Sequence, residues 1–200
     1  VPAMDAARSL AYSFGAAKDK DHPIELTRDQ VNGILRKLAQ ENPSFLGTWT
    51  LWEPNSFDGL DEQYANTPLH DQTGRFIPYW VWVSDTVEGV AIVDYETPGL
   101  NDYYAIPRET RQETILTPYF YPIEGVDVMM TSVAVPIVEN NRFYGAAGVD
   151  LPIGFVQGLV DGINLYDGEA SALLFTEDGT VIAARNQPEL ALQSATSLFD

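Results

Sequence analysis

Hydrophobic positions at helical spacing predict two helices before any strand appears. The first covers residues 3–17, and the charged stretch KDKDHP after it predicts a linker. The second helix begins after Thr27, which serves as N-cap, and Gln30 three positions later completes a capping box. The segment ENP ends it. The buried stripes expected on these helices are Met4, Ala7, Leu10, Ala11 and Phe14 on the first, and Val31, Ile34, Leu35 and Leu38 on the second.

From Leu46 onward the hydrophobic period changes to two, which predicts strands. In GRFIPYWVWV, the alternation places Trp80 and Trp82 on one face and Tyr79 on the other, and we interpret Trp82 as packing. Asn140 and Asn141 tolerate a positive φ and therefore predict a hairpin turn. The other predicted strands are LGTWTLWEP, GVAIVDY, DVMMTSVAVPIV and RFYGAAGVDL.

The last fifty residues predict a short helix and a second hairpin. The segment PIGFVQGLVDGI reads as a helix with Phe155, Leu159 and Ile163 inward. The segment ASALLFTEDGTVIAARN reads as a hairpin that turns at Asp178 and Gly179. A new module starts near Leu165, and it has too few strands to close a sheet alone, so it is either truncated or paired with the first module.

This order of elements predicts an α+β fold with a long N-terminal helix laid along antiparallel sheets. The expected divisions are residues 1–26 for the N-terminal helix and linker, 27–164 for a first module, and 165–200 for the start of a second. A hydrophobic content of 45% in 200 residues is sufficient for a real core.

The charge balance narrows the class of partner. The chain has 29 acidic and 11 basic residues, a formal net charge of −18, which argues against nucleic acid and favours cations. The alternative is that acidity only keeps the domain soluble. There is no cysteine, so thiol chemistry and disulfides are excluded, and no apolar run is long enough to span a membrane.

The sequence lacks the motifs of common catalytic and cofactor sites. It has no phosphate-binding loop and no dinucleotide fingerprint, and its only histidines are His22 in the linker and His70 in a predicted surface turn. The acidic segment FDGLDEQ lacks the alternating ligands of a calcium loop. We therefore predict a protein that is not an enzyme and has no metal or cofactor. A carboxylate pair for glycoside hydrolysis remains an alternative, because many acids are available.

Aromatic residues and carboxylates gather in three segments and at one strand end. Rings and carboxylates together are the chemistry that selects an organic ammonium. The alternative is that the rings only fill the core. The candidate ligand-binding residues are Tyr79, Trp80, Asp94, Glu96, Tyr119, Tyr121 and Asp150.

Asp150 is the candidate with the clearest physical reason. It ends the strand YGAAGVD, whose residues are small or apolar, so a carboxylate there needs a hydrogen-bond donor or a cation. It could equally cap the helix that follows, since Asp is a preferred N-cap and Pro152 suits a first turn. The sequence leaves both interpretations open.

Six segments carry a resemblance to a known family. They are GTWTLWEPNSFDGLD, HDQTGRFIPYW, DYE with DYYAIPRET, ETILTPYFYP, DVMMTSVAVPI and FYGAAGVDL. In this order they resemble the double Cache sensor domain of bacterial methyl-accepting chemotaxis receptors, with the greatest similarity to the amine- and polyamine-responsive branch. The similarity is strong up to Leu151 and weak beyond it.

This resemblance implies PAS-like sheets, a ligand-binding membrane-distal module (27–164) and a partial membrane-proximal module (165–200). It implies a periplasmic region of an inner-membrane receptor, flanked by transmembrane helices, acting as a homodimer and signalling to a cytoplasmic chemotaxis module. The family residue that takes the ligand amine matches Asp150, and the ligand-facing aromatic pair matches Tyr79 and Trp80. A second family aspartate falls at Tyr121, so Asp94 or Glu96 is expected to supply the other carboxylate.

Arg75 departs from the pattern of amino-acid-sensing relatives, in which an arginine just before the aromatic pair grips the ligand carboxylate. Here it is displaced and the aromatic pair is reversed. The predicted ligand is therefore a small cationic amine such as putrescine or a related biogenic amine. An amino-acid sensor, a carbohydrate-active enzyme and a ligand-free dimerisation module are the alternatives.

Overall fold

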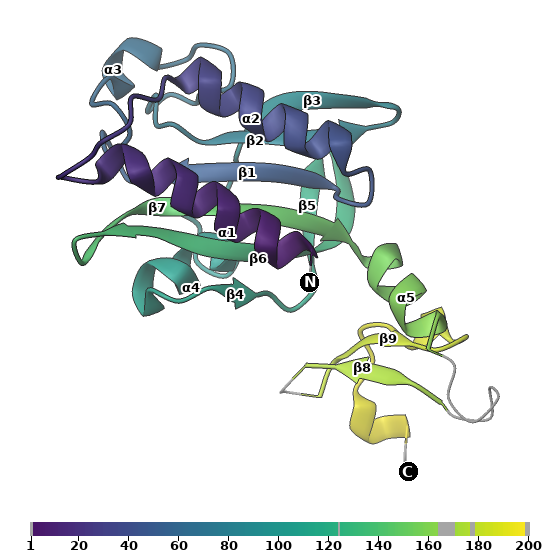
Figure 1. Cartoon of the computed structure of the whole chain (residues 1–200). Helices are drawn as coiled ribbons and strands as arrows, with labels where there is room; N and C mark the ends of the chain where they lie inside the picture. The colour runs from purple at the N-terminus through teal and green to yellow at the C-terminus, as the bar shows by residue number, and fades with distance from the viewer. Residues whose placement is uncertain (1, 124, 164–170, 177–178, 199–200) are drawn as a thin grey trace. The chain divides into compact units, whose positions relative to one another are not determined.

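The computed structural model describes residues 2–123, 125–163, 171–176 and 179–198, and the chain divides into two compact units. The first unit contains residues 1–116 and 132–150, and the second contains 117–131 and 151–200. The module bounds expected from the sequence remain predictions. Figure 1 shows the elements of the chain.

Two helices of the first unit cover one face of its sheet (Figure 1). Helix α1 spans Pro2–Gly15 and continues into the short 3-10 helix η1, Ala16–Lys18. Helix α2 spans Arg28–Glu41, and the capping box of Thr27 and Gln30 is present, so that prediction is confirmed. The N-terminal helix prediction is confirmed as well.

The strands form an antiparallel sheet in the order β3-β2-β1-β7-β6-β4, with β5 paired to β6. The predicted α+β class is confirmed, and Asn140 and Asn141 turn the β6–β7 hairpin with φ of 50° and 61°. Strand β5 and residues 126–131 of β6 belong to the second unit. The strand bounds are β1 Gly47–Trp52, β2 Pro78–Val83, β3 Thr86–Ala91, β4 Thr114–Ile115, β5 Tyr119–Ile123, β6 Val126–Glu139 and β7 Arg142–Pro152.

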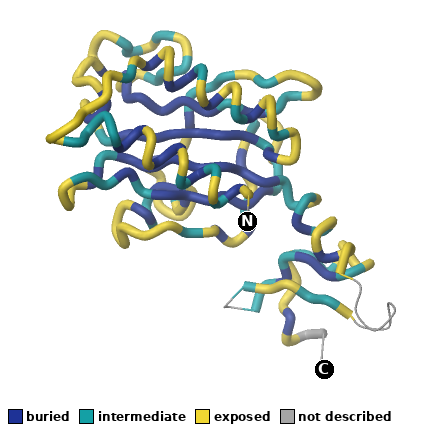
Figure 2. Tube along the Cα trace, viewed as in Figure 1, coloured by how far each residue is buried: buried dark blue, intermediate teal, exposed yellow. Residues whose placement is uncertain are grey.

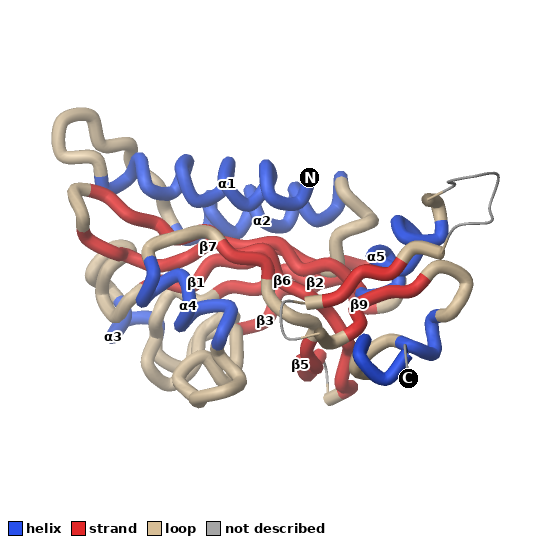
Figure 3. The backbone as a smooth tube through the Cα atoms, turned by 90° about the horizontal axis from the view of Figure 1, so that it is seen from below, coloured by secondary structure: helices blue, strands red, loops and turns tan. Residues whose placement is uncertain are grey.

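The two faces of the sheet in the first unit have different cover. Figure 3 shows α1 and α2 on one face and α4, Asp102–Thr110, with its loops on the other. Every residue of β1 is buried, and the central strands appear as the dark core of Figure 2. Thr48 donates to the Leu35 carbonyl on the helix face, so its neighbour Trp49 points to the opposite face. Trp82 also packs on the helix face, donating to the Ala39 carbonyl at 3.2 Å.

The buried side of α2 differs from the predicted stripe. Val31, Leu35 and Ala39 are fully buried, whereas Ile34 is 41% exposed. The polar Asn32 takes an inward position because it accepts a hydrogen bond from the Trp80 indole of the sheet. The hydrophobic pattern alone does not reveal an inward polar residue of this kind.

Two helices were not predicted, and one strand is shorter than expected. The short α3 spans Asp61–Tyr64, and α4 carries Pro107 inside it, which disfavours a helix prediction. Strand β3 ends at Ala91, so the expected strand 89–95 is wrong beyond that residue.

In the second unit, α5 spans Ile153–Asp161, and β8 (Leu173–Phe175) pairs with β9 (Val181–Ala184) as predicted. The inward residues of α5 are Val156 and Val160, which pack on Ala183. Leu159 is 57% exposed, so the predicted stripe of Phe155, Leu159 and Ile163 is wrong by one position. The unit closes with the 3-10 helices η3, Pro188–Leu190, and η4, Ala195–Leu198. Leu165 and Asp178, where we expected a module start and a turn, lie outside the described residues.

Candidate ligand-binding site

Two glycines allow aromatic rings to lie close against the sheet in the first unit. A Cβ built on Gly148 of β7 would overlap the Trp49 ring, and one on Gly47 of β1 would come 2.5 Å from the Tyr79 ring. Gly47 is paired with Asp150 across the β1–β7 ladder, so the two rings flank that carboxylate. The glycines of β1 and β7 thus leave the space that the rings of Tyr79 and Trp49 occupy on the neighbouring strands.

Asp150 is the charged residue at the centre of this arrangement. It is 4% exposed, and its Oδ1 accepts hydrogen bonds from Trp49 Nε1 at 2.9 Å and from Ser132 Oγ at 2.6 Å. The three residues come from β7, β1 and β6. Helix α5 has Pro152 as N-cap and no side-chain capping bond, so the interpretation of Asp150 as a helix cap is wrong.

Burial raises the pKa of Asp150 to about 6, although hydrogen bonds from Ser132, Trp49 and Tyr79 favour the charged form and oppose this effect. Those three donors are neutral. Asp150 takes part in none of the ion pairs given for the described residues. Asp150 is therefore a buried carboxyl group whose three hydrogen-bond donors are all neutral, which is the arrangement that a cationic ligand would complete.

Helix α4 covers part of the site through Tyr103. Its ring meets the Trp49 ring edge to face, with centroids 5.6 Å apart, and its hydroxyl donates to the Val93 carbonyl at 2.9 Å. Sequence reasoning did not select Trp49 or Ser132. The large Trp49 opposite the small Gly148 is a usable signal once the strand pairing is known, whereas Ser132 gives none.

Trp80 lies on the other face of the sheet from Tyr79. Its indole Nε1 donates to Asn32 Oδ1 of α2 at 2.9 Å, and the Arg36 guanidinium stands 5.7 Å from its ring centroid. The alternation predicted from the sequence is thus confirmed. The structure brings Tyr79 and Asp150 together but turns Trp80 toward the helices.

Asp94 and Glu96 lie in the loop after β3. Asp94 is exposed with a φ of 57°, and Glu96 forms an ion pair with Arg75. No hydrogen bond given for the described residues joins either carboxylate to Asp150. The assignment of these two residues to the same site as Asp150 stays a prediction.

Arg75 is itself a buried charge, with 4% exposure, and its guanidinium is committed to the fold. Nε and Nη2 donate to the Trp52 carbonyl at 3.0 and 2.8 Å, and Nη2 also donates to the Tyr104 hydroxyl at 3.1 Å. With Glu96 added, every guanidinium nitrogen has a partner.

Tyr119 and Tyr121 lie on β5 in the second unit. Their ring centroids are 6.5 Å apart in an edge-to-face arrangement, and Tyr121 is buried. Opposite them on β6 are Met130 and Val128.

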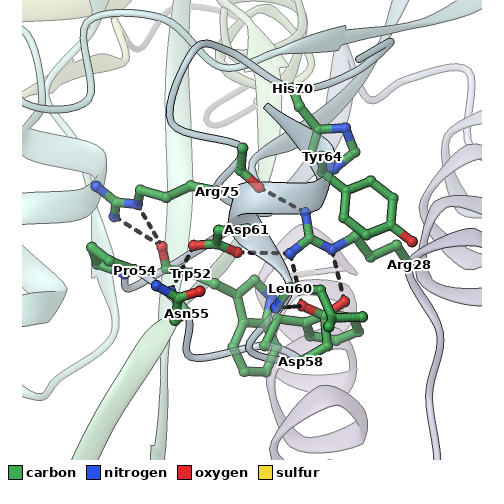
Figure 4. A network of polar contacts seen from close by, with 12 residues as sticks. Arg28, Trp52, Pro54, Asn55, Asp58, Leu60, Asp61, Tyr64, His70 and Arg75 are labelled. Carbon is green, nitrogen blue, oxygen red and sulfur yellow. Dashed lines mark hydrogen bonds and ion pairs between the residues drawn. The ribbon is translucent and has the colours of Figure 1, made fainter. Parts of the chain in front are cut away.

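The acidic segment FDGLDEQ, which lacks the ligand pattern of a calcium loop, binds an arginine in the structure. Arg28 at the start of α2 donates to Asp58 at 2.9 and 2.8 Å, to Asp61 at 2.7 Å and to the Gly74 carbonyl at 2.8 Å (Figure 4). The Tyr64 ring lies 4.1 Å from the guanidinium carbon. Over the described residues, no group of three or more His, Asp or Glu side chains has metal-binding geometry.

Comparison with known proteins places this site in context. Residues 31–157 match the family described as the methyl-accepting chemotaxis protein-like first PDC sensor domain. Over 155 residues the chain is 29% identical to the methyl-accepting chemotaxis protein TlpQ of Pseudomonas aeruginosa, covering 70% of this chain and 22% of that receptor.

Among solved structures, the chain is similar to the extracellular domain of the histidine kinase mmHK1S-Z3, with 30% identity and a TM-score of 0.82 over 99% of this chain and 68% of that one. The periplasmic sensory domain of the Campylobacter jejuni chemoreceptor Tlp1 shares the fold, with 19% identity and a TM-score of 0.67 over 98% of this chain and 69% of that one. The chain thus spans about a fifth of the curated receptor that it matches. Within the described ranges, the helices are too short or too polar to cross a bilayer.

Proposed function

Because the chain belongs to the methyl-accepting chemotaxis protein-like first PDC sensor-domain family, we propose that it is the part of a receptor that binds a small cationic amine. Its relatives are extracellular sensor domains of chemoreceptors and histidine kinases. Such domains are non-enzymatic, so family membership confirms the prediction that the chain is not an enzyme and removes the glycosidase alternative.

The observation that carries the amine proposal is the burial of the Asp150 carboxyl group among neutral hydrogen-bond donors. A carboxylate that is 4% exposed and receives bonds from Trp49, Ser132 and Tyr79 has hydrogen-bond donors but no positive charge. A ligand ammonium would supply that charge together with further donors. Because water is excluded, the attraction would be stronger than at the protein surface.

The contact energies expected at this site can be compared with the free energy of micromolar binding. A hydrogen bond to a charged group contributes about 1.5 to 3 kcal/mol, and a cation–π contact about 0.5 to 2 kcal/mol. One such hydrogen bond and two rings contribute about 2.5 to 7 kcal/mol, so a second hydrogen bond from the ligand is needed to reach the roughly 8 kcal/mol of micromolar affinity. Trp49 and Tyr79 are the rings that flank Asp150.

The commitment of Arg75 supports an amine over an amino acid. An amino acid brings a carboxylate that needs a cationic partner, and the guanidinium of Arg75 already serves Trp52, Tyr104 and Glu96. A ligand with positive charge alone makes no such demand. The excess of acidic residues, 29 against 11 basic, favours the same ligand class.

These contacts decide which residues we assign to the proposed site. Asp150 and Tyr79 form its centre together with Trp49, and Trp80 is omitted because its side chain faces α2. The assignments of Asp94, Glu96, Tyr119 and Tyr121 to the same site stay predictions.

For the whole receptor, we extend the proposal by analogy with the relatives. It would place this domain in the periplasm, flanked by transmembrane helices of an inner-membrane receptor, with a homodimer relaying the signal to a cytoplasmic chemotaxis module. The named relatives are chemoreceptors and a histidine kinase, which supports this arrangement.

Isothermal titration calorimetry of the domain tests the ligand class. Putrescine, spermidine and histamine are titrated against a panel of L-amino acids at pH 7.5. We expect binding of at least one amine at micromolar affinity and no binding of the amino acids. If only amino acids bind, the amine proposal is wrong.

A further inference from the structure

Two of the hydrogen bonds to Asp150, those from Trp49 and Ser132, end on the same oxygen. Trp49 Nε1 and Ser132 Oγ both donate to Oδ1, at 2.9 and 2.6 Å. They arrive from β1 and β6, the two strands that neighbour β7 in the sheet. A carboxyl group held from both sides at one oxygen has little freedom to rotate about its χ2 angle, which is otherwise broad for Asp.

Both donors belong to the buried centre of the first unit. Ser132 is fully buried, and the Trp49 ring is held between Gly148 beneath it and Tyr103 beside it. Neither donor can turn away without leaving a buried polar group unpaired, which is energetically costly. Their hydrogen bonds are therefore a fixed property of the folded domain.

The same two bonds oppose the effect of burial on the ionisation of Asp150. Donors to a carboxylate favour its charged form, and burial favours its neutral form. Hydrogen bonds from Ser132, Trp49 and Tyr79 lower the pKa of Asp150, against the larger effect of burial. Tyr79 on β2 is the other titratable group given for this site among the described residues.

We infer that Trp49 and Ser132 are positioning residues for the Asp150 site, because they orient its carboxyl group and keep it ionised for a cationic ligand. This inference rests on the proposed function for its ligand but not for its effect on Asp150 itself. If Trp49 and Ser132 only filled space in the core, replacing them would not change the titration of Asp150.

Carbon-detected NMR titration of the Asp150 carboxyl group tests the inference without any ligand. Trp49→Phe keeps an aromatic side chain but removes the N–H donor together with part of the indole, and Ser132→Ala removes the hydroxyl. Each should move the ionisation midpoint of Asp150 to higher pH.

The matched controls are Trp82→Phe and Thr50→Val. Each loses a hydrogen bond of the same chemical type, to the backbone carbonyls of Ala39 and Ala146 rather than to Asp150. Neither control should move the Asp150 midpoint. Equal midpoints in the wild type and in both test variants, with thermal unfolding showing that all are folded, would overturn the inference.

Putrescine titration at pH 6 and pH 8 adds the ligand. Loss of one hydrogen bond to a charged group should weaken binding about tenfold at pH 6. The loss should be smaller at pH 8, where Asp150 is ionised in every variant. If the wild type binds no amine while the NMR midpoints still move, the proposed function fails and the positioning role stands. If putrescine binds all variants equally at both pH values, the positioning role fails.

Discussion

Arg75 and Asp150 are both charged residues with 4% exposure in the same unit, yet their surroundings differ in one decisive respect. Arg75 has an anionic partner in Glu96 as well as the Trp52 carbonyl and the Tyr104 hydroxyl. Asp150 has only neutral donors. Removing one partner of a buried charged contact is costly, so Arg75 is tied to the fold, whereas the proposed function assigns the missing positive partner of Asp150 to a ligand.

Arg75→Met gives the largest expected effect, on stability. Removing the guanidinium leaves the Trp52 carbonyl and the Tyr104 hydroxyl without their donor in a buried environment. We expect the free energy of unfolding to fall by about 2 to 6 kcal/mol, because each of these two buried groups costs about 1 to 3 kcal/mol when unpaired. Urea denaturation at pH 7 measures it. A loss below 1 kcal/mol would show that Arg75 is not the structural charge of this comparison.

Asp150→Asn should leave the free energy of unfolding of the ligand-free domain unchanged or higher, in contrast to Arg75→Met. At pH 7 the carboxylate is ionised in a site that favours its neutral form, so a neutral amide relieves a cost of up to roughly 3 kcal/mol. The amide oxygen can still accept from Trp49 and Ser132. Denaturation should therefore show equal or greater stability without ligand. A destabilisation of more than about 1 kcal/mol would indicate that Asp150 acts as a structural charge.

The same residue predicts a pH dependence of stability. The pKa of Asp150 is about 6 in the folded state and lies near 3.9 in an unfolded chain. Because the folded-state pKa is raised, the protonated Asp150 contributes to the free energy of unfolding. This contribution is fully present below about pH 4 and is lost as the pH rises through 6. Subtracting the unfolding free energies of Asp150→Asn from those of the wild type across pH 4 to 7 isolates this slope. A flat difference would mean that burial does not perturb Asp150.

Glu96→Gln is expected to have the smallest effect. The Glu96 side chain is 62% exposed although its partner Arg75 is buried, and exposed ion pairs contribute about 0 to 1 kcal/mol. If the contacts of Asp150 define the site, amine affinity should also stay within about twofold. A tenfold loss on calorimetry would instead support Glu96 as the second ammonium partner that the sequence suggested.

Local signals in the sequence predicted local structure well. The capping box of Thr27 and Gln30 and the turn at Asn140 and Asn141 each depend on neighbouring residues, and both are present. Strand alternation also separated Tyr79 from Trp80 correctly. The resemblance to a family then suggested both residues for one site, and the hydrogen bond of Trp80 to Asn32 shows that they face different layers.

The centre of the site was only partly accessible from the sequence. Asp150 could be selected because a carboxylate among small apolar residues needs a partner. Its partner Trp49 is 101 positions away, and the pairing of β1 with β7 that joins them is a property of the whole fold. Helix α4 was missed because Pro107 stands inside it, and with α4 the contact of Tyr103 on Trp49 was missed too.

Proton release on putrescine binding is the most direct test of the central claim that Asp150 receives a ligand ammonium. Calorimetry at pH 6 in two buffers of different ionisation enthalpy measures it, and putrescine itself stays fully charged at this pH. Because the pKa of Asp150 is about 6, an ammonium that binds its carboxylate should release about half a proton per ligand. Asp150→Asn should neither release protons nor bind tightly. Tight binding to the wild type with no proton release would contradict the account.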